Sequence, residues 1–209
     1  MRATSWPVTL RHQPLELRPL RYRDAGAWDD VRRRNRDWLS PWDATSPDPR
    51  LAPVSFRTMV RRYNAQARMG ESLPWALCVD GALAGQVNVA GIVRGSAQMA
   101  HVGYWIDRAH AGHGYVPTAV AMAIDFCFTH LRLHRVEINI RPENRASLRV
   151  VEKLGMRSEG LRERLLHIDG DWRDHLSFAV TADEVPDGIL TRLRRDTPGH
   201  LRGSTRHDP

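Results

Sequence analysis

A glycine-bearing loop between an apolar strand and an apolar helix is the part of the sequence best suited to chemistry. Val102–Ile106 alternates as a strand does, Gly112-His113-Gly114 forms the loop, and Tyr115–His130 is rich in Ala, Val and Met. Each glycine lets the backbone approach a ligand closely, and the first N–H groups of a helix have no partner within it. Because the helix dipole also places positive charge there, we predict that the loop binds the pyrophosphate of a nucleotide-bearing cofactor.

The spacing of these glycines excludes two other phosphate-binding motifs. A dinucleotide-binding fingerprint needs a third glycine, which is missing here, and a P-loop needs Gly-Lys-Ser/Thr, which does not follow Gly114. Since Gly-x-Gly alone is also typical of an ordinary turn, the prediction depends on a second segment.

That second segment is His134–Met156. It indicates a strand, a break at Pro142 and a helix that begins near Asn144 and ends at Gly155. Asn144 and Ser147 lie about one helical turn apart and therefore face the same way. Spacing alone leaves two interpretations open: a pair that contacts a ligand, or a helix N-cap followed by a first-turn serine.

Together these segments resemble the GNAT superfamily of acyl-CoA-dependent N-acetyltransferases, and within it the RimJ type of ribosomal-protein N-acetyltransferase. The resemblance covers about Leu15 to Val180. Its most specific motifs are Gly103-Tyr104-Trp105, Gly112-x-Gly114-Tyr115, Arg141-Pro142-x-Asn144-x-x-Ser147, Leu154-Gly155 and Asp169-Gly170-x-Trp172-Arg173-Asp174-His175. It implies an α/β (α+β) fold with a mixed, mostly antiparallel central sheet and helices on both faces. In this family acetyl-CoA lies between two neighbouring strands that diverge.

The resemblance also implies which residues bind coenzyme A. The backbone of Tyr104–Ile106 is expected to hold the thioester carbonyl, Asn144 the pantetheine amides, and Ser147 the sulfur, to which it would supply a proton. The expected cofactor-binding set is Tyr104, Trp105, Ile106, Gly112, His113, Gly114, Tyr115, Val116, Asn144 and Ser147. The chain departs from the family at Ala109, where Gln or Arg is usual. We expect binding to survive, because such loops bind mainly through backbone N–H groups.

Glu137 and His101 are the candidates for the general base. Glu137 lies on a strand whose alternate residues are apolar, so its carboxylate is expected to face a cleft, or else to pair with a nearby arginine. His101 lies where relatives often carry an acid, and its alternative is a hydrogen-bonded strand histidine. Asp174 and His175 are a third option, or they fix the last hairpin.

Two tryptophans, Trp38 and Trp42, resemble the family segment that covers the acceptor site, so we expect them to line the amine pocket. Considered alone, two tryptophans this close are more often core anchors.

The charge balance of the chain is strongly basic. It has 209 residues, 31 basic against 24 acidic side chains, and a formal net charge of +7, with Lys153 as the single lysine. This indicates a surface attracted to polyanions, either CoA or RNA, or simply records a GC-rich genome. The size and composition predict one globular domain.

Cys78 and Cys127 lie in apolar segments and are expected to be buried packing residues. His110 and His113 lack partners at zinc-ligand spacing, so we expect no metal. The N-terminal residues contain no apolar signal core and no run is long enough to cross a membrane, which favours the cytoplasm.

The expected domain organisation is a lead-in over residues 1–13, an acetyltransferase domain over 14–182, and a basic tail over 183–209 that is partly disordered, with a short helix near Ile189 to Arg194. Asp24 is expected to cap the first helix. Trp38–Pro49 is too rich in Pro and turn residues to predict regular structure. Leu165–Asp169 and His175–Val180 are expected to form the last hairpin.

The leading functional hypothesis is transfer of an acetyl group from acetyl-CoA to the N-terminal α-amine of a protein such as a ribosomal protein, by direct attack in a ternary complex. The alternatives are acetylation of a small amine (antibiotic, polyamine or amino acid) and an inactive module that binds RNA or the ribosome. The sequence leaves open the acyl group, for which succinyl is the alternative to acetyl, and the choice between monomer and homodimer.

Overall fold

An eight-stranded sheet forms the centre of the protein in a computed structural model, which describes residues 6–48, 50 and 54–195. Its strand order is β1-β2-β3-β4-β5-β6-β8-β7, and only the β5–β6 pair is parallel among the described strands. The strands are β1 (Leu10–His12), β2 (Leu15–Pro19), β3 (Leu73–Val79), β4 (Ala82–Val93), β5 (Met99–Ile106), β6 (Arg135–Ile140), β7 (Arg157–Ile168) and β8 (Asp171–Thr181). The mixed, mostly antiparallel sheet is the one that the sequence predicts.

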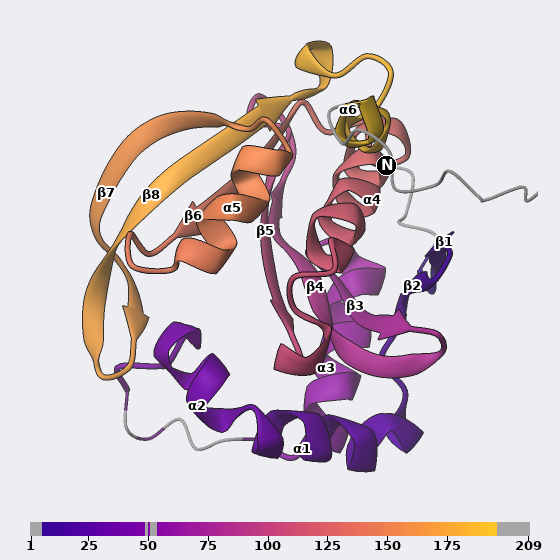
Figure 1. Cartoon of the computed structure of the whole chain (residues 1–209), viewed down its shortest axis with the longest axis vertical. Helices are drawn as coiled ribbons and strands as arrows, with labels where there is room; N and C mark the ends of the chain where they lie inside the picture. The colour runs from indigo at the N-terminus through magenta and orange to yellow at the C-terminus, as the bar shows by residue number, and fades with distance from the viewer. Residues whose placement is uncertain (1–5, 49, 51–53, 196–209) are drawn as a thin grey trace, which may run out of the picture.

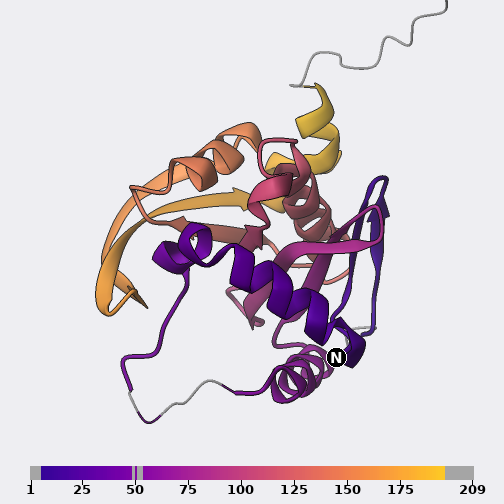
Figure 2. The same cartoon turned by 60° about the horizontal axis from the view of Figure 1, so that its bottom comes forward.

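Helices cover both faces of this sheet, as expected (Figure 1). One face carries α4 (Tyr115–Thr129), α5 (Arg145–Lys153) and α6 (Ile189–Arg195), and the other carries α1 (Ala25–Arg34), α2 (Arg36–Leu39) and α3 (Phe56–Met69). Within the described residues, these elements are joined by the short 3-10 turns η1 (Tyr22–Asp24), η2 (Ser40–Trp42), η3 (Arg108–His110) and η4 (Ala182–Glu184). In Figure 2 the indigo helix α1 crosses in front of the sheet, and the purple helix α3 lies next to the start of α1, where Phe56 packs against Trp28.

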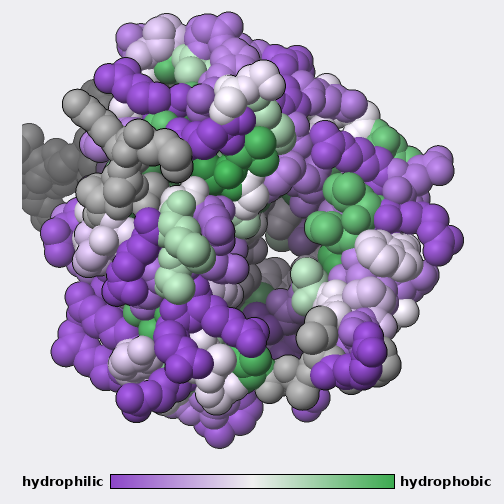
Figure 3. All heavy atoms as spheres, turned by 180° about the vertical axis from the view of Figure 1, so that it is seen from behind, coloured by the Kyte–Doolittle hydropathy of each residue, from purple (hydrophilic) through white to green (hydrophobic). Residues whose placement is uncertain are grey.

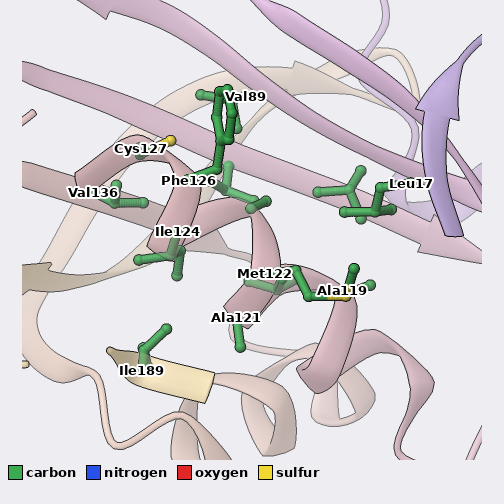
Figure 4. Packing of buried hydrophobic residues seen from close by; sticks show 14 of the residues in the cluster. Leu17, Val89, Ala119, Ala121, Met122, Ile124, Phe126, Cys127, Val136 and Ile189 are labelled. Carbon is green, nitrogen blue, oxygen red and sulfur yellow. The ribbon is translucent and has the colours of Figure 1, made fainter. Parts of the chain in front are cut away.

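The central helix α4 is buried on nearly every side, which fixes the loop that precedes it. Figure 4 shows Met122, Ile124 and Phe126 of this helix among side chains from the sheet and from α6. Cys127 is fully buried there, and Cys78 is buried on the opposite face, so both cysteines are packing residues as predicted. A helix held this firmly presents its N-terminus at a defined place at the edge of the sheet.

The two strands that were expected to diverge do so. β5 and β6 pair only at Met99↔Arg135, Ala100↔Val136 and His101↔Glu137. Beyond these pairs β5 continues along β4, while β6 continues along β8 as far as Ile140. A wedge therefore opens between them, and one side of Val102–Ile106 faces it without a strand partner in the described part of the chain.

A single glycine sets where β5 lies. Gly85 of β4 pairs with Ile106, and a Cβ built at Gly85 would collide with the backbone carbonyl of Trp105. Any side chain at this position would therefore push the end of β5 toward the wedge. The Trp105 ring packs on the sheet face that carries α1, edge-on against Trp28 with ring centroids 5.2 Å apart.

Local expectations were wrong at two places. Asp24 precedes α1 but does not cap it, because its carboxylate accepts hydrogen bonds from Arg18 at 2.7 and 2.9 Å and from the Arg21 N–H at 2.8 Å. The first part of Trp38–Pro49 is helical, since α2 and η2 continue from α1 to Trp42.

The ends of the chain also contain more structure than the sequence indicated. β1 lies inside the expected lead-in, and β7 begins eight residues before Leu165, at Arg157. The predicted short helix is present as α6, whose first N–H groups, at Ile189 and Leu190, donate to the half-buried carboxylate of Asp125. The predicted disorder of the last residues concerns 196–209, which lie outside the described residues.

Candidate active site

A cleft of about 680 Å³ lies in the wedge between β5 and β6. The structure brings together in its lining most of the residues that the sequence predicts: Trp38, Trp42, Tyr104, Trp105, Ile106, Gly112, Gly114, Tyr115, Val116, Asn144 and Ser147. Three predicted residues are not part of the lining: Glu137, His101 and His113. From behind, the molecule is visibly hollowed near its middle (Figure 3).

The loop at one end of the cleft has the backbone geometry that an anion site needs. Gly112 and Gly114 have φ angles of 85° and 80°, in the left-handed region that favours glycine, and the space where a Cβ would lie is open at both. Gly114 is the N-cap of α4, and Tyr115 and Val116 contribute first-turn N–H groups that no carbonyl of the helix can accept. The next residue is Pro117, so no donor is lost there. His113 lies outside the cleft and stacks on Tyr115.

A buried carboxylate holds the start of this loop. Asp107 is 2% exposed and accepts hydrogen bonds from Asn35 Nδ2 at 2.9 Å, from the Ala109 N–H at 3.2 Å and from Arg34. Burial alone would raise the pKa of Asp107, but these hydrogen bonds outweigh it and hold the pKa below its ordinary value. The carboxylate is therefore ionised at neutral pH and ties the loop to the end of α1.

A stripe of three cations along α5 also lines the cleft, and sequence reasoning missed it. Arg145, Arg149 and Lys153 recur every four residues, which places them on one helix face, and all three are exposed. None of them has an acidic partner among the described residues. The spacing was visible in the sequence, but it was noticed only as part of the overall charge.

The start of α5 is fixed to the β5 wall of the cleft. Asn144 Oδ1 accepts from the Ser147 N–H at 3.0 Å, so Asn144 is an N-cap, and Tyr104 Oη donates to the Ser147 carbonyl at 3.3 Å. Burial raises the pKa of Tyr104 well above its ordinary value, which keeps the phenol protonated as a donor. The Ser147 side chain also interacts with the Tyr104 hydroxyl, and Ser147 lines the cleft.

The two candidates for the base lie together behind the cleft. Glu137 is 3% exposed and is bound by Arg135 at 2.8 Å and by Arg162 at 3.1 Å, with His101 Nδ1 at 3.6 Å. Its carboxylate thus lies in the arginine pairs that were its alternative interpretation, away from the lining of the cleft. Asn139, which lines the cleft, is next to this group: its amide nitrogen lies 3.5 Å from His101 Nδ1.

His175 is a further histidine of the lining. It is 2% exposed, and its Nδ1 lies 2.9 Å from the Arg173 carbonyl oxygen. Burial lowers the pKa of this imidazole below its ordinary value, although the hydrogen bond to Arg173 opposes the shift. Its ring is therefore neutral at neutral pH.

The far end of the cleft is assembled from segments distant in sequence. Trp38 Nε1 donates to the Ile106 carbonyl at 3.2 Å, and Arg141 lies 5.4 Å from the centroid of the Trp42 ring. Arg141 also donates to the Pro41 carbonyl at 2.9 Å. Both tryptophans are thus fastened to the cleft walls.

A short strap closes this end. Ala44 forms a β-bridge with Ile168, the Thr45 N–H donates to the His167 carbonyl at 2.9 Å, and Thr45 Oγ1 lies 2.7 Å from His167 Nδ1. The segment after η2 is therefore joined to the tip of the β7–β8 hairpin (Figure 1). We call this junction of Ala44–Thr45 with His167–Ile168 the strap.

Comparison with known proteins decides the family. Residues 14–157 match the model of the acetyltransferase (GNAT) domain. The chain belongs to the GNAT acetyltransferase family. The Bacillus subtilis protein YjcK, named a probable N-acetyltransferase, is 31% identical over 173 residues, which are 82% of this chain and 96% of YjcK. The Escherichia coli enzyme named [ribosomal protein uS5]-alanine N-acetyltransferase is 28% identical, over 87% of this chain and 94% of that protein.

Solved structures of GNAT proteins agree with this fold. Mycobacterium smegmatis RimJ, solved in complex with CoA-disulfide, superposes with a TM-score of 0.85 at 38% identity, covering 91% of this chain and 95% of that chain. The ribosomal-protein-S5-alanine acetyltransferase of Vibrio fischeri superposes with a TM-score of 0.75 at 25% identity, over 85% of this chain and 98% of that one.

As a GNAT acetyltransferase the protein uses acetyl-CoA, which supplies an acetyl group activated as a thioester. The residues present fit this donor. First-turn N–H groups and the cation stripe face one end of the cleft, where they suit a diphosphate. The edge of β5 that lacks a strand partner suits an extended amide chain in the middle.

Neither a metal centre nor a membrane segment is found among the described residues. No group of three or more His, Cys, Asp or Glu side chains there could hold a metal ion. None of the described helices combines the length and the apolar character needed to cross a membrane.

Proposed function

We propose that the protein acetylates the N-terminal α-amine of a protein, with a ribosomal protein as the acceptor. The observation that carries this choice is the charge of the cleft lining. Its carboxylates, Asp43 and Glu143, are both paired, with Arg32 and Arg141 respectively. No unpaired carboxylate of the described lining is left for a polycation, so a polyamine or aminoglycoside is a poor match, whereas a chain end carries one ammonium group.

The relatives support the same choice. The RimJ structure and the Escherichia coli enzyme that is named for the alanine of ribosomal protein uS5 both align over most of the chain. A spermidine N(1)-acetyltransferase of Vibrio cholerae also matches, but over only 31% of this chain. Such an acceptor also agrees with the cytoplasmic location that the sequence favours.

The chemistry of an α-amine suits the groups in the cleft. An α-amino group titrates near 7.7–8.0, so a weak base deprotonates it at neutral pH, whereas a lysine side chain near 10.4 needs more help. We assign the amine pocket to Trp38 and Trp42, which line the strapped end of the cleft. The strap limits access at that end, which favours a chain terminus over a side chain in the middle of a folded surface.

The roles of the remaining residues follow from where they lie. The backbone of Tyr104–Ile106 orients the thioester carbonyl and stabilises the charge that develops on its oxygen. Asn144 contacts the pantetheine arm with the donor side of its amide while Oδ1 caps α5. Ser147 supplies the proton to the leaving thiolate. Glu137 and His101, which the sequence predicts as the base, lie outside the lining, so from their positions they would need Asn139 to reach the amine.

The inactive, RNA-binding alternative is not favoured. It predicts a degraded donor site, but Gly112, Gly114, Asn144 and Ser147 all line one cleft, and the chain is a GNAT acetyltransferase.

A panel of acceptors tests the proposal. The protein is incubated with acetyl-CoA and four acceptor classes: free N-terminal peptides that begin with Ala or Ser, N-terminally blocked peptides that contain lysine, spermidine, and an aminoglycoside. Mass spectrometry should find one added acetyl group on the free N-terminal peptides and much slower modification of the other three. Faster acetylation of spermidine, the aminoglycoside or the blocked peptides would overturn the choice of acceptor. A parallel series with succinyl-CoA tests the acyl group.

A further inference from the structure

His175 lies in the wall of the cleft at a place where a strand ends. Its neighbour on β8, Leu176, pairs with Ile140, which is the last residue of β6. Residues of β8 and β6 that pair directly share a face, as the 2.6 Å hydrogen bond from Ser177 Oγ to Asn139 Oδ1 shows. His175 therefore continues the row of Asn139 and Ser177 beyond the end of β6, into the lining of the cleft.

The hydrogen bond of His175 fixes which nitrogen carries the proton. Nδ1 lies 2.9 Å from the Arg173 carbonyl oxygen, and a carbonyl can only accept, so Nδ1 is the donor. In a neutral ring the other nitrogen, Nε2, then holds a free lone pair. Nε2 has no hydrogen-bond partner among the described residues. A buried histidine that presents a basic nitrogen to a cleft in this way is arranged as a proton acceptor.

The surroundings of the ring favour its neutral form. The charged groups near it are Arg141 and Glu143 from the segment after β6, and Asp174 beside it on β8. Its pairing partner on β7 is Arg162, whose guanidinium is bound to Glu137 at 3.1 Å. Burial lowers the pKa of His175 most, and Arg141 lowers it further. Because the pKa of His175 is lowered, the ring stays unprotonated, and can act as a base, to lower pH than a free imidazole.

We propose that His175 is the general base that deprotonates the acceptor amine. This inference rests on the proposed function in that the acceptor is a protonated amine. Nε2 takes one proton from R–NH₃⁺, and the freed nitrogen lone pair forms a bond to the thioester carbonyl carbon. The C–S bond breaks with its electron pair on sulfur. The second amine proton passes to that sulfur by way of Ser147, which gives the amide, the CoA thiol and an imidazolium that returns its proton to water.

Two substitutions separate catalysis from structure. His175→Asn places an amide N–H near the position of Nδ1, so the bond to the Arg173 carbonyl can be kept while the base is lost. His175→Gln places its amide near Nε2 and loses both. His134→Asn, at a histidine whose side chain is 61% exposed, is the matched control. Both His175 variants should lower kcat by about 100- to 1,000-fold, in the range of proton-transfer groups, with the KM for acetyl-CoA unchanged in His175→Asn.

The pH dependence is the readout that a purely structural role would not move. In the native protein kcat should reach a plateau above an acidic limb that lies below pH 6.5, since only the neutral ring is active. In His175→Asn the profile of kcat against pH should lose both the acidic limb and the plateau, and the residual kcat should rise with hydroxide concentration. A His175→Asn enzyme with native kcat and the native pH profile would overturn the proposal.

A measurement without any acceptor distinguishes this inference from the choice of substrate. Nitrogen-15 NMR of histidine-labelled protein should show His175 at pH 7 as the neutral tautomer with hydrogen on Nδ1. A protonated ring, or hydrogen on Nε2, would overturn the role of His175 whatever the acceptor. If the panel instead identifies a small amine, the proposed function fails, and the same kinetics with that amine still decide the role of His175.

Discussion

The two ends of the cleft are built in different ways. The end that we assign to the donor consists of consecutive residues, Gly112–Val116, and mainly of their backbone. The end that we assign to the acceptor consists of side chains from separate segments: Arg141 contacts Pro41, 100 residues away in the chain, and Thr45 contacts His167, 122 residues away. The donor end therefore depends on local conformation, whereas the acceptor end depends on the whole fold being in place.

The difference has a functional meaning. A site made of backbone groups recognises what every donor molecule shares, because its geometry changes little with side-chain identity. A site made of side chains on joined segments can change with single substitutions, so we expect it to set the choice of acceptor. The following changes test this division, beginning with the largest expected effect.

Replacement of Gly114 should abolish acetyl-CoA binding. The space beside Gly114 is open and belongs to the cleft, so the indole of Gly114→Trp would fill the place that we assign to the diphosphate. Calorimetric titration should show a loss of at least about 100-fold in affinity, because several charge-assisted hydrogen bonds are lost together. Gly95→Trp is the matched control, since Gly95 also has a positive φ, of 70°, and open space. Normal titration of a folded Gly114→Trp protein would contradict the assignment of the loop.

Ser147 lies between the two ends, and its loss should affect turnover rather than binding. Ser147→Ala keeps the backbone groups that contact Asn144 and Tyr104, so the start of α5 should not move. We expect kcat to fall by roughly ten- to several-hundred-fold, in the range of proton-transfer groups, while acetyl-CoA affinity is kept. Steady-state kinetics with a matched calorimetric titration check this, and an unchanged kcat would remove Ser147 from the mechanism.

At the acceptor end, Trp42→Ala should raise the KM for the acceptor by about tenfold, in the range that loss of a buried aromatic contact causes. The KM for acetyl-CoA, which serves as the internal control, should change much less, because Trp42 lies with Pro41 and Arg141 near the strap. Initial rates measured against each substrate in turn test this. Equal rises in both KM values would mean that the two ends are not separate.

The smallest effect is expected for the cation stripe of α5. Arg149→Gln should weaken acetyl-CoA binding by about two- to fivefold, since an exposed charge pair contributes up to ~1 kcal/mol. The loss should shrink at high salt, because added ions screen the interaction. Arg57→Gln on α3, on the other face of the sheet, is the control. A salt-independent loss in Arg149→Gln would argue for a packing role instead.

Sequence reasoning succeeded where the structure is local. Gly112 and Gly114 were recognised because a left-handed turn before a helix has a simple signature, and Asn144 because capping acts over three residues. It did not find β7 before Leu165, since that edge strand is exposed on both faces and shows no alternation. Helical structure through Pro41 was also missed, because proline is acceptable in the first turn of a helix.

Long-range partners explain the remaining differences. The alternation of β6 predicted a polar face at Glu137, but not that Arg162 of β7 would cover it. Nor could the sequence show that Asp24 binds Arg18, because that pairing competes with helix capping and depends on β2. The strap was invisible for the same reason, since neither Ala44 nor Ile168 carries a motif of its own.

The short pairing between β5 and β6 has a consequence for local opening of the sheet. Three residue pairs join strands β1–β5 to strands β6–β8, whereas β6 and β8 are joined by six. The sheet thus consists of two panels that share little hydrogen bonding, and a donor molecule lying along Val102–Ile106 would add the missing bonds. Amide hydrogen exchange in that stretch should slow when the donor binds. The hydrogen bonding of this edge of β5 would then be complete only in the donor complex.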